Sequence, residues 1–189
     1  MIKKILIHFF IFSAGISFSQ QEKGIHYIGG MYYGAGFHNF TTPVISQSVL
    51  VNNVGGRLAF SIGKYFRIGI MGGNTFKHYD ENASSYKIGH GGLTGEFNYK
   101  ANRLNAGLGI YTGGGKYRNL YVTGKTGNSI TGDYRNESFM FFVPFATASY
   151  SLTTKLSLSC MIEYFDDMLF SKQLACGGTN VKIGILFSR

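Results

Sequence analysis

The chain of 189 residues has no tryptophan, only two cysteines and, after residue 19, no run of 18 uninterrupted apolar residues. Because a helix that crosses a bilayer needs about 20 such residues, residues 20–189 are not expected to contain one. No window of that region repeats apolar residues at helical spacing over three turns. Two cysteines and scattered histidines do not make a metal site, and no cofactor motif is present. These absences exclude a helical fold and leave β-structure.

Residues 1–19 have the three parts of a secretory signal peptide. Lys3 and Lys4 supply the positive start, and the apolar run that follows covers only 12 residues, too few for a membrane anchor. No cysteine follows the expected cleavage position, which argues against a lipid anchor. We predict cleavage before Gln20, which leaves one β-barrel domain over residues 20–189.

Apolar residues in the remaining chain alternate with small or polar ones, as in strands that have one apolar face. The clearest hairpin covers residues 58–70, where Leu58, Phe60 and Ile62 alternate, residues 63–65 turn the chain and the alternation resumes. The same pattern predicts eight strands, at residues 24–38, 48–62, 66–79, 86–99, 103–117, 138–150, 155–165 and 177–188. Short turns alternate with longer connections, which are expected at 39–47, 80–85, 118–137 and 166–176.

An even number of strands with short turns at one end and longer loops at the other is typical of a transmembrane β-barrel. We therefore predict an eight-stranded antiparallel up-and-down barrel in the outer membrane of a Gram-negative cell. Its partners would be outer-membrane lipid and the barrel-insertion machinery. The alternative is a soluble lipocalin-like barrel, which buries its apolar face inside. Glycine on the polar faces and aromatic residues near strand ends favour the membrane.

The charged residues indicate which partners the chain binds and what fills the interior of the barrel. The 18 basic residues exceed the 9 acidic ones, but they are scattered rather than gathered on one face, so no nucleic-acid contact is expected. With the apolar faces outward, several charged residues point into a lumen that has room only for side chains. Because unpaired buried charges are costly, we predict a structural network of paired charges there, and an ion or substrate pathway is the alternative. Its members would be Arg57, Glu96, Glu163 and Lys182.

The sequence contains no complete catalytic motif. Small outer-membrane barrels include lipid-A-modifying enzymes, which need a nucleophile and a histidine within hydrogen-bond reach. His78 and Asp80 lie near one expected loop, but no serine is placed beside them. The segment Gly113–Lys116 lacks the remaining residues of a phosphate-binding loop. The chain is therefore predicted not to be an enzyme, and Cys160 and Cys176 are expected to be free thiols.

Five glycine-containing segments lie in the predicted strands: Lys23–Gly30, Gly56–Ser61, Gly89–Tyr99, Ala106–Gly109 and Val181–Ile185. They resemble the TraO family of conjugative transposons and occur in the family's order. The family's tryptophan positions have no counterpart here. The resemblance implies an outer-membrane component of a conjugative DNA-transfer apparatus, with other conjugal-transfer proteins as partners. It implies neither catalysis nor contact with DNA.

A second function remains open. The chain would then be an OmpX- or opacity-like surface barrel whose outer loops bind host, phage or other cell-surface partners. Loops carry most of the function on a rigid scaffold, and residues 118–137 form the longest expected loop. Its candidate contact surface consists of Tyr121, Lys125, Asn128, Tyr134 and Arg135.

Overall fold

The computed structural model describes residues 26–41, 46–78, 85–126, 129–166 and 175–188. The predicted signal peptide, residues 1–19, lies outside them and stays a prediction. Among the described residues, no helix is long and apolar enough to cross a membrane.

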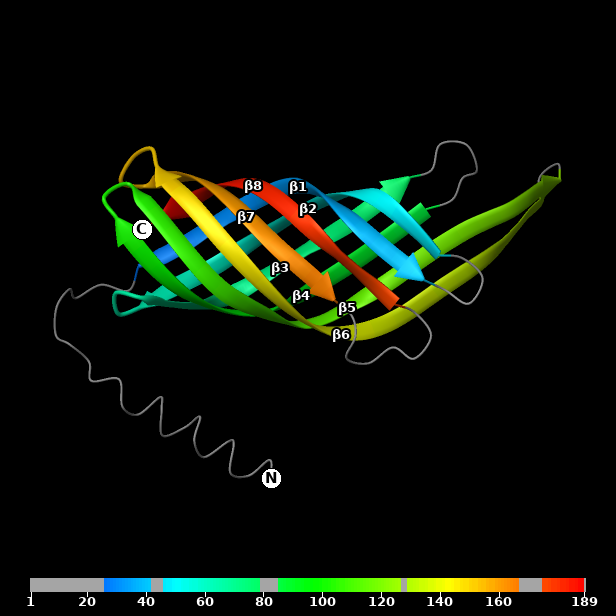
Figure 1. Ribbon diagram of the computed structural model, residues 1–189, viewed down its shortest axis with the longest axis horizontal. Helices are drawn as coiled ribbons and strands as arrows, with labels where there is room; N and C mark the ends of the chain where they lie inside the picture. Colours follow the sequence, from blue (N-terminus) through cyan, green and yellow to red (C-terminus); the bar gives the residue numbers. More distant parts are fainter. Residues whose placement is uncertain (1–25, 42–45, 79–84, 127–128, 167–174, 189) are drawn as a thin grey trace, which may run out of the picture.

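Eight antiparallel strands follow one another around a closed barrel, and the last strand pairs with the first (Figure 1). This confirms the predicted fold class. The strands are β1 (Tyr27–Thr41), β2 (Ser46–Ile62), β3 (Phe66–His78), β4 (Ser85–Ala101), β5 (Leu104–Thr126), β6 (Ser129–Ser151), β7 (Leu156–Asp166) and β8 (Ala175–Ser188).

Three short turns lie at one end of the barrel, the end that also holds the start of β1 and the end of β8 (Figure 1). Two of them contain a residue in the left-handed backbone region, Gly63 with φ 64° and Asn102 with φ 55°. Glycine and asparagine are the residues that adopt this conformation most easily. In the third turn the amide of Leu152 donates to the carbonyl of Leu156. The turn predicted at residues 63–65 is thus confirmed, as are the short turns that the predicted strands leave at residues 100–102 and 151–154.

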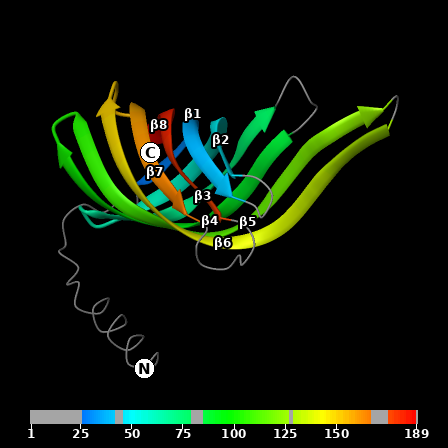
Figure 2. The same cartoon turned by 45° about the vertical axis from the view of Figure 1, so that its right-hand side comes forward.

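The loop predicted at residues 118–137 is wrong. β5 and β6 contain 23 residues each and stay paired as far as Thr126 and Ser129, with one bulge between Val122 and Gly124. The pairing of β4 with β5 ends earlier, at Ser85 and Leu120, so the end of the hairpin projects beyond the barrel wall (Figures 1 and 2). We call this projection, residues 119–126 and 129–135, the arm.

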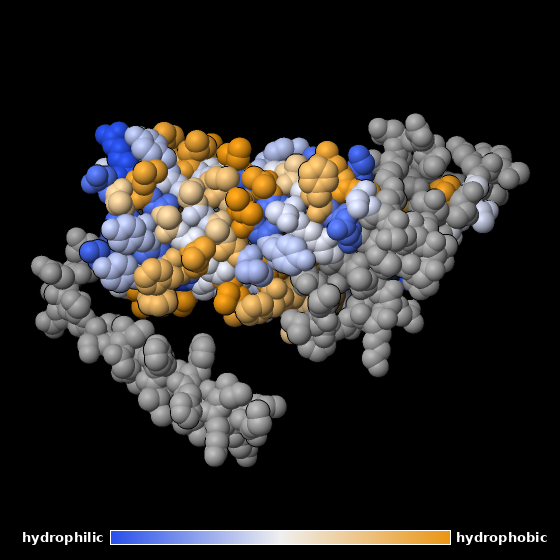
Figure 3. All heavy atoms as spheres, viewed as in Figure 1, coloured by the Kyte–Doolittle hydropathy of each residue, from blue (hydrophilic) through white to orange (hydrophobic). Residues whose placement is uncertain are grey.

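Apolar side chains cover the outside of the barrel (Figure 3). On β1 the outward positions are Tyr27, Met31, Tyr33 and Phe37, and Met31 is 71% exposed. Exposed apolar surface of this extent marks contact with lipid or a partner, and a continuous outer band is the property of membrane barrels. The lipocalin-like alternative, with its apolar residues inside and polar residues outside, is therefore excluded.

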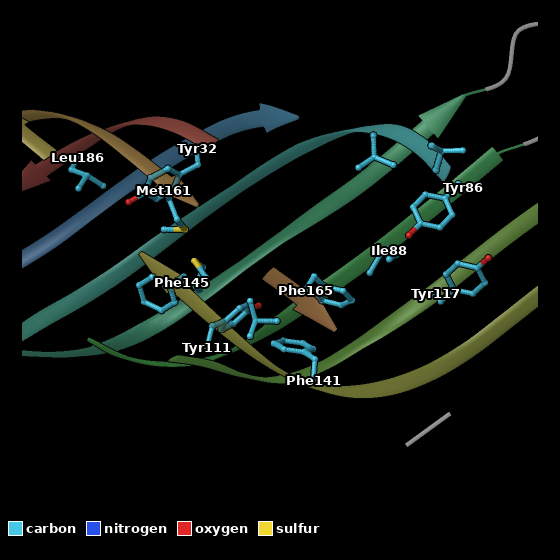
Figure 4. Close-up of a cluster of buried hydrophobic side chains, with 14 residues drawn as sticks. Tyr32, Tyr86, Ile88, Tyr111, Tyr117, Phe141, Phe145, Met161, Phe165 and Leu186 are labelled. Carbon is cyan, nitrogen blue, oxygen red and sulfur yellow. The ribbon is translucent and has the colours of Figure 1, made fainter. Parts of the chain in front are cut away.

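Side chains fill the interior. Buried apolar residues from all eight strands line it, and many of them are aromatic (Figure 4). Tyr111, Phe139, Phe141 and Phe165 pack together, with 4.6 Å between the ring centroids of Tyr111 and Phe141. We call these four residues the aromatic cluster. A narrow eight-stranded barrel leaves interior space for side chains and little else.

Candidate functional site

The first candidate site is the lumen, where the four charged residues of the predicted network form two ion pairs. Near the short turns, Nη2 of Arg57 on β2 lies 2.5 Å from Oε2 of Glu96 on β4. Thr147 donates to the other carboxylate oxygen of Glu96. Arg67 lies 3.9 Å from Oε2 of Glu96 and donates to Oδ1 of Asn98 at 2.7 Å. Two guanidinium groups thus face one carboxylate.

The second ion pair lies nearer the arm end of the barrel. Nζ of Lys182 on β8 is 2.5 Å from Oε1 of Glu163 on β7, and Nδ2 of Asn180 donates to the same oxygen at 3.0 Å. Oδ1 of Asn180 accepts a hydrogen bond from Asn53 at 3.0 Å and lies 2.9 Å from Nε2 of His38. This chain of contacts crosses the lumen from β7 and β8 to β1 and β2.

The strand register explains two of the contacts around the carboxylates, but not the two ion pairs themselves. Arg67 is the direct cross-strand partner of Glu96, and Glu163 is that of Asn180. Side chains at such positions are close enough to interact. The four charged residues are all buried, and each carboxylate has a cationic partner within the lumen. The arrangement can neutralise and fill the lumen, so a structural role for these residues stays our interpretation.

The sequence analysis did not identify several polar residues of the lumen as members of the network. The signal that could have found them is strand parity, because each alternates with an outward apolar position. They are His38, Asn53, Asn98, Thr147 and Asn180.

The histidines of the lumen contact asparagine and tyrosine side chains. Nε2 of His38 lies 2.9 Å from Oδ1 of Asn180, and its Nδ1 lies 3.1 Å from the hydroxyl of Tyr86. Nδ1 of His90 lies 2.8 Å from the hydroxyl of Tyr111. The side chain of His78 and all of Asp80 lie outside the described residues. These contacts give the enzyme alternative no support.

Possible metal ligands and the thiol of Cys160 lie in the described part of the chain. There, no three His, Cys, Asp or Glu side chains are grouped so that they could hold a metal ion. Cys160 is a free thiol, as predicted, and its cross-strand partner on β8 is Ile183. The side chain of Cys176 is not described.

The second candidate site is the arm. Tyr134 on β6 is 60% exposed, and Arg135 beside it is half-buried. Tyr121 and Lys125 belong to β5 by their backbone pairing, and their side chains are not described. Asn128 lies outside the described residues. The structure therefore places four of the five candidate contact residues on a two-stranded ribbon rather than on a loop.

Comparisons with known proteins connect the chain to a fold. No family model matches the sequence, and no curated protein is significantly similar to it. Among solved structures, the barrel is similar to Neisserial surface protein A (NspA), with 12% identity, 87% of this chain and 99% of that chain covered, and a TM-score of 0.60. OprG from Pseudomonas aeruginosa gives 8% identity, coverages of 90% and 98%, and a TM-score of 0.57.

A third similar structure is Ail, the attachment invasion locus protein of Yersinia pestis. It gives 11% identity, coverages of 85% and 98%, and a TM-score of 0.52. Identities this low show a shared fold. Together with the apolar outer surface, that fold makes the chain a β-barrel of the Gram-negative outer membrane, as the sequence predicts.

Proposed function

We propose that this chain is a non-enzymatic outer-membrane barrel that presents its arm to a partner at the cell surface. The observation that supports this function is the length of β5 and β6, which contain 23 residues each, whereas the other six strands contain 11 to 17. Beyond Leu120, six further residues of β5 extend the hairpin by roughly 20 Å at about 3.3 Å per residue.

The arm differs from a loop in two ways that favour binding. It continues two strands of the barrel wall, so it is held in a defined direction and loses little conformational entropy when a partner binds. Its two strands also reach beyond Ser85 and Leu120, the last described pair of β4 and β5, so the arm projects from the wall towards a partner. Exposed Tyr134 supplies the kind of side chain that dominates binding energy at interfaces.

The partner class follows from the resemblance to the TraO family. We propose that the partner is another protein of a conjugative DNA-transfer apparatus. A deletion of the gene in a donor strain is then expected to lower conjugation frequency, and an arm-shortened variant is expected to fail to restore it. Normal transfer by the deletion strain would exclude this role and leave other cell-surface partners for the arm.

Photo-crosslinking in living cells tests the arm itself. A photoreactive phenylalanine analogue at Tyr134 should give a discrete adduct, because this side chain lies at the base of the arm. Tyr99 is the matched control, because it is 62% exposed, against 60% for Tyr134, but lies at the opposite end of the barrel. The same adducts from both positions, or none from either, would contradict the proposed function.

A further inference from the structure

Three basic side chains gather on the outer wall just below the base of the arm. Lys87 on β4 and Arg118 on β5 are direct cross-strand partners, and Lys116 lies two residues before Arg118 on the same face of β5. All three are exposed and alternate with buried residues such as Tyr86 and Tyr117, so they point away from the lumen. Side chains at such positions are close enough to act together. We call these three residues the basic patch.

The basic patch lies at the outer edge of the apolar band. On the same outward face of β4, Phe97 and Leu93 are 49% and 65% exposed. Phe97, near the short turns, and Lys87 lie ten positions apart on this strand. That separation is about 33 Å along the strand at about 3.3 Å per residue, or about 25 Å in height at a tilt of about 40°. Since the apolar band of such barrels is about 25 Å tall and their short turns face the periplasm, the patch lies at the depth of the outer-leaflet headgroups.

The charges of the basic patch are available to an anion from outside the chain. No ion pair within the described part of the chain involves Lys87, Lys116 or Arg118. The neighbouring outward positions of β6 are Asn136 and Ser138, which can donate further hydrogen bonds. Like charges on adjacent strands repel one another, so an anion bound between the three side chains would stabilise the arrangement.

A strip of glycines separates the basic patch from the apolar band. Gly72, Gly91 and Gly114 are cross-strand neighbours on β3, β4 and β5. A Cβ at Gly91 or Gly114 would come no closer than 3.9 Å or 3.5 Å to another atom, and neither residue has a positive φ. The barrel itself therefore has room for a side chain at both positions. Glycine weakens a strand and often marks a place where a ligand approaches the backbone closely. We call these three residues the glycine strip.

We propose that the basic patch and the glycine strip bind a phosphorylated glycolipid of the outer leaflet, the class to which lipid A belongs. A headgroup phosphate lies at the patch, because lysine and arginine are the side chains that bind phosphate best. An acyl chain lies along the strip and continues onto the apolar row that begins with Ile70 and Leu93. The charge and depth of the patch select this ligand. The proposal goes beyond the presentation of the arm and does not depend on it.

Thermal unfolding of the refolded barrel in micelles of an uncharged detergent tests the binding. The probes are bisphosphorylated lipid A, the same lipid without its phosphates, and inorganic phosphate. We expect bisphosphorylated lipid A to raise the unfolding midpoint by about 3 °C or more, and the other two probes to raise it much less. An equal shift from the dephosphorylated lipid would overturn the proposal. So would an equal shift from inorganic phosphate, because the acyl chain would then contribute nothing.

Removing the charges tests the basic patch against a matched control. The triple variant Lys87→Gln, Lys116→Gln, Arg118→Gln should lose most of the shift that lipid A produces. The control changes three exposed cations at the short-turn end, as Lys64→Gln, Lys100→Gln, Arg103→Gln, and should keep the shift. Equal losses in the two triple variants would show that net charge attracts the lipid, and the proposal would be refuted.

Filling the glycine strip tests the site without any change of charge. Gly91→Leu should lose most of the lipid A shift, because its side chain occupies the place of the acyl chain. Gly95→Leu is the matched control, because Gly95 lies on the same face of β4, also has room for a Cβ and lies within the apolar band. Both variants should fold, since outward apolar side chains suit this wall. A full shift in Gly91→Leu would contradict the proposal.

Discussion

At the scale of single residues, the four charged residues of the predicted network form two pairs. Arg57 and Lys182 each have a carboxylate partner 2.5 Å away, and both ion pairs are buried. Replacing one member leaves the other charge in a site with little water. Such a loss typically costs about 3–5 kcal/mol, whereas replacing both members often costs little.

We expect Glu96→Gln to destabilise the barrel by about 3 kcal/mol, because Arg57 would lose its counter-charge. Urea unfolding of the refolded protein in lipid vesicles measures this effect. The double variant Arg57→Met, Glu96→Gln should be more stable than the sum of the two single changes predicts. Strict additivity would show that the two side chains do not interact.

A turn residue gives a prediction of a different kind. Neither Gly63 nor Gly95 has an atom near the position of an added Cβ, but only Gly63 has a positive φ, of 64°. Gly63→Ala should therefore cost about 1 kcal/mol of unfolding free energy through backbone strain. Gly95→Ala, the matched control, should be neutral or slightly stabilising. Equal effects of the two substitutions on the urea midpoint would refute this explanation.

At the scale of strands, the sequence predicts the barrel better than the arm. All eight predicted strands exist, because alternation is strong where one face meets lipid and the other meets the lumen. The arm has no such contrast of environments, so its residues do not alternate in polarity. Only the cross-strand pairing, which parity does not reveal, shows that β5 and β6 continue.

The alternation of residues along a strand also predicts whether a charged side chain faces the lumen or the lipid. It does not predict how far along the barrel axis that side chain lies. Arg57, Glu96, Glu163 and Lys182 are buried, and they meet as two separate pairs. Depth in a barrel depends on how far each strand is staggered against the next. That stagger is set by the register of all eight strands together, which local sequence patterns do not specify.

The backbones of β1 and β8 approach each other closely at Gly34. A Cβ at Gly34 on β1 would collide with the carbonyl oxygen of Val181 on β8, whereas a Cβ at Gly29 on the same strand would make ordinary contacts. Gly34→Ala should cost about 2–3 kcal/mol, because the backbones would have to separate. Gly29→Ala should be close to neutral. Gel mobility of unboiled samples along a urea series would reveal the difference, and similar midpoints for the two variants would contradict it.

At the scale of the whole molecule, a filled lumen predicts that the barrel does not conduct. Two ion pairs and the aromatic cluster occupy the interior. Recordings in planar bilayers should therefore show no large, stable conductance steps. Shortening Phe141 and Phe165 together to alanine should produce leak currents, because it removes two rings from the cluster. Large steady channels from the unmodified protein would instead support the ion or substrate pathway.

The orientation of the barrel wall in lipid is the claim on which the rest depends, and site-directed spin labelling measures it directly. Labels are attached at Met31, Leu108 and Ile183, one at a time, in a background without Cys160 and Cys176. All three positions point outward, Met31 and Ile183 from the neighbouring strands β1 and β8, and Leu108 from β5 elsewhere in the wall. In lipid bilayers, each label should collide more often with dissolved oxygen, which concentrates in hydrocarbon, than with a water-soluble nickel complex. Labels that collide more often with the nickel complex would show that this surface faces water, and the membrane barrel would be refuted.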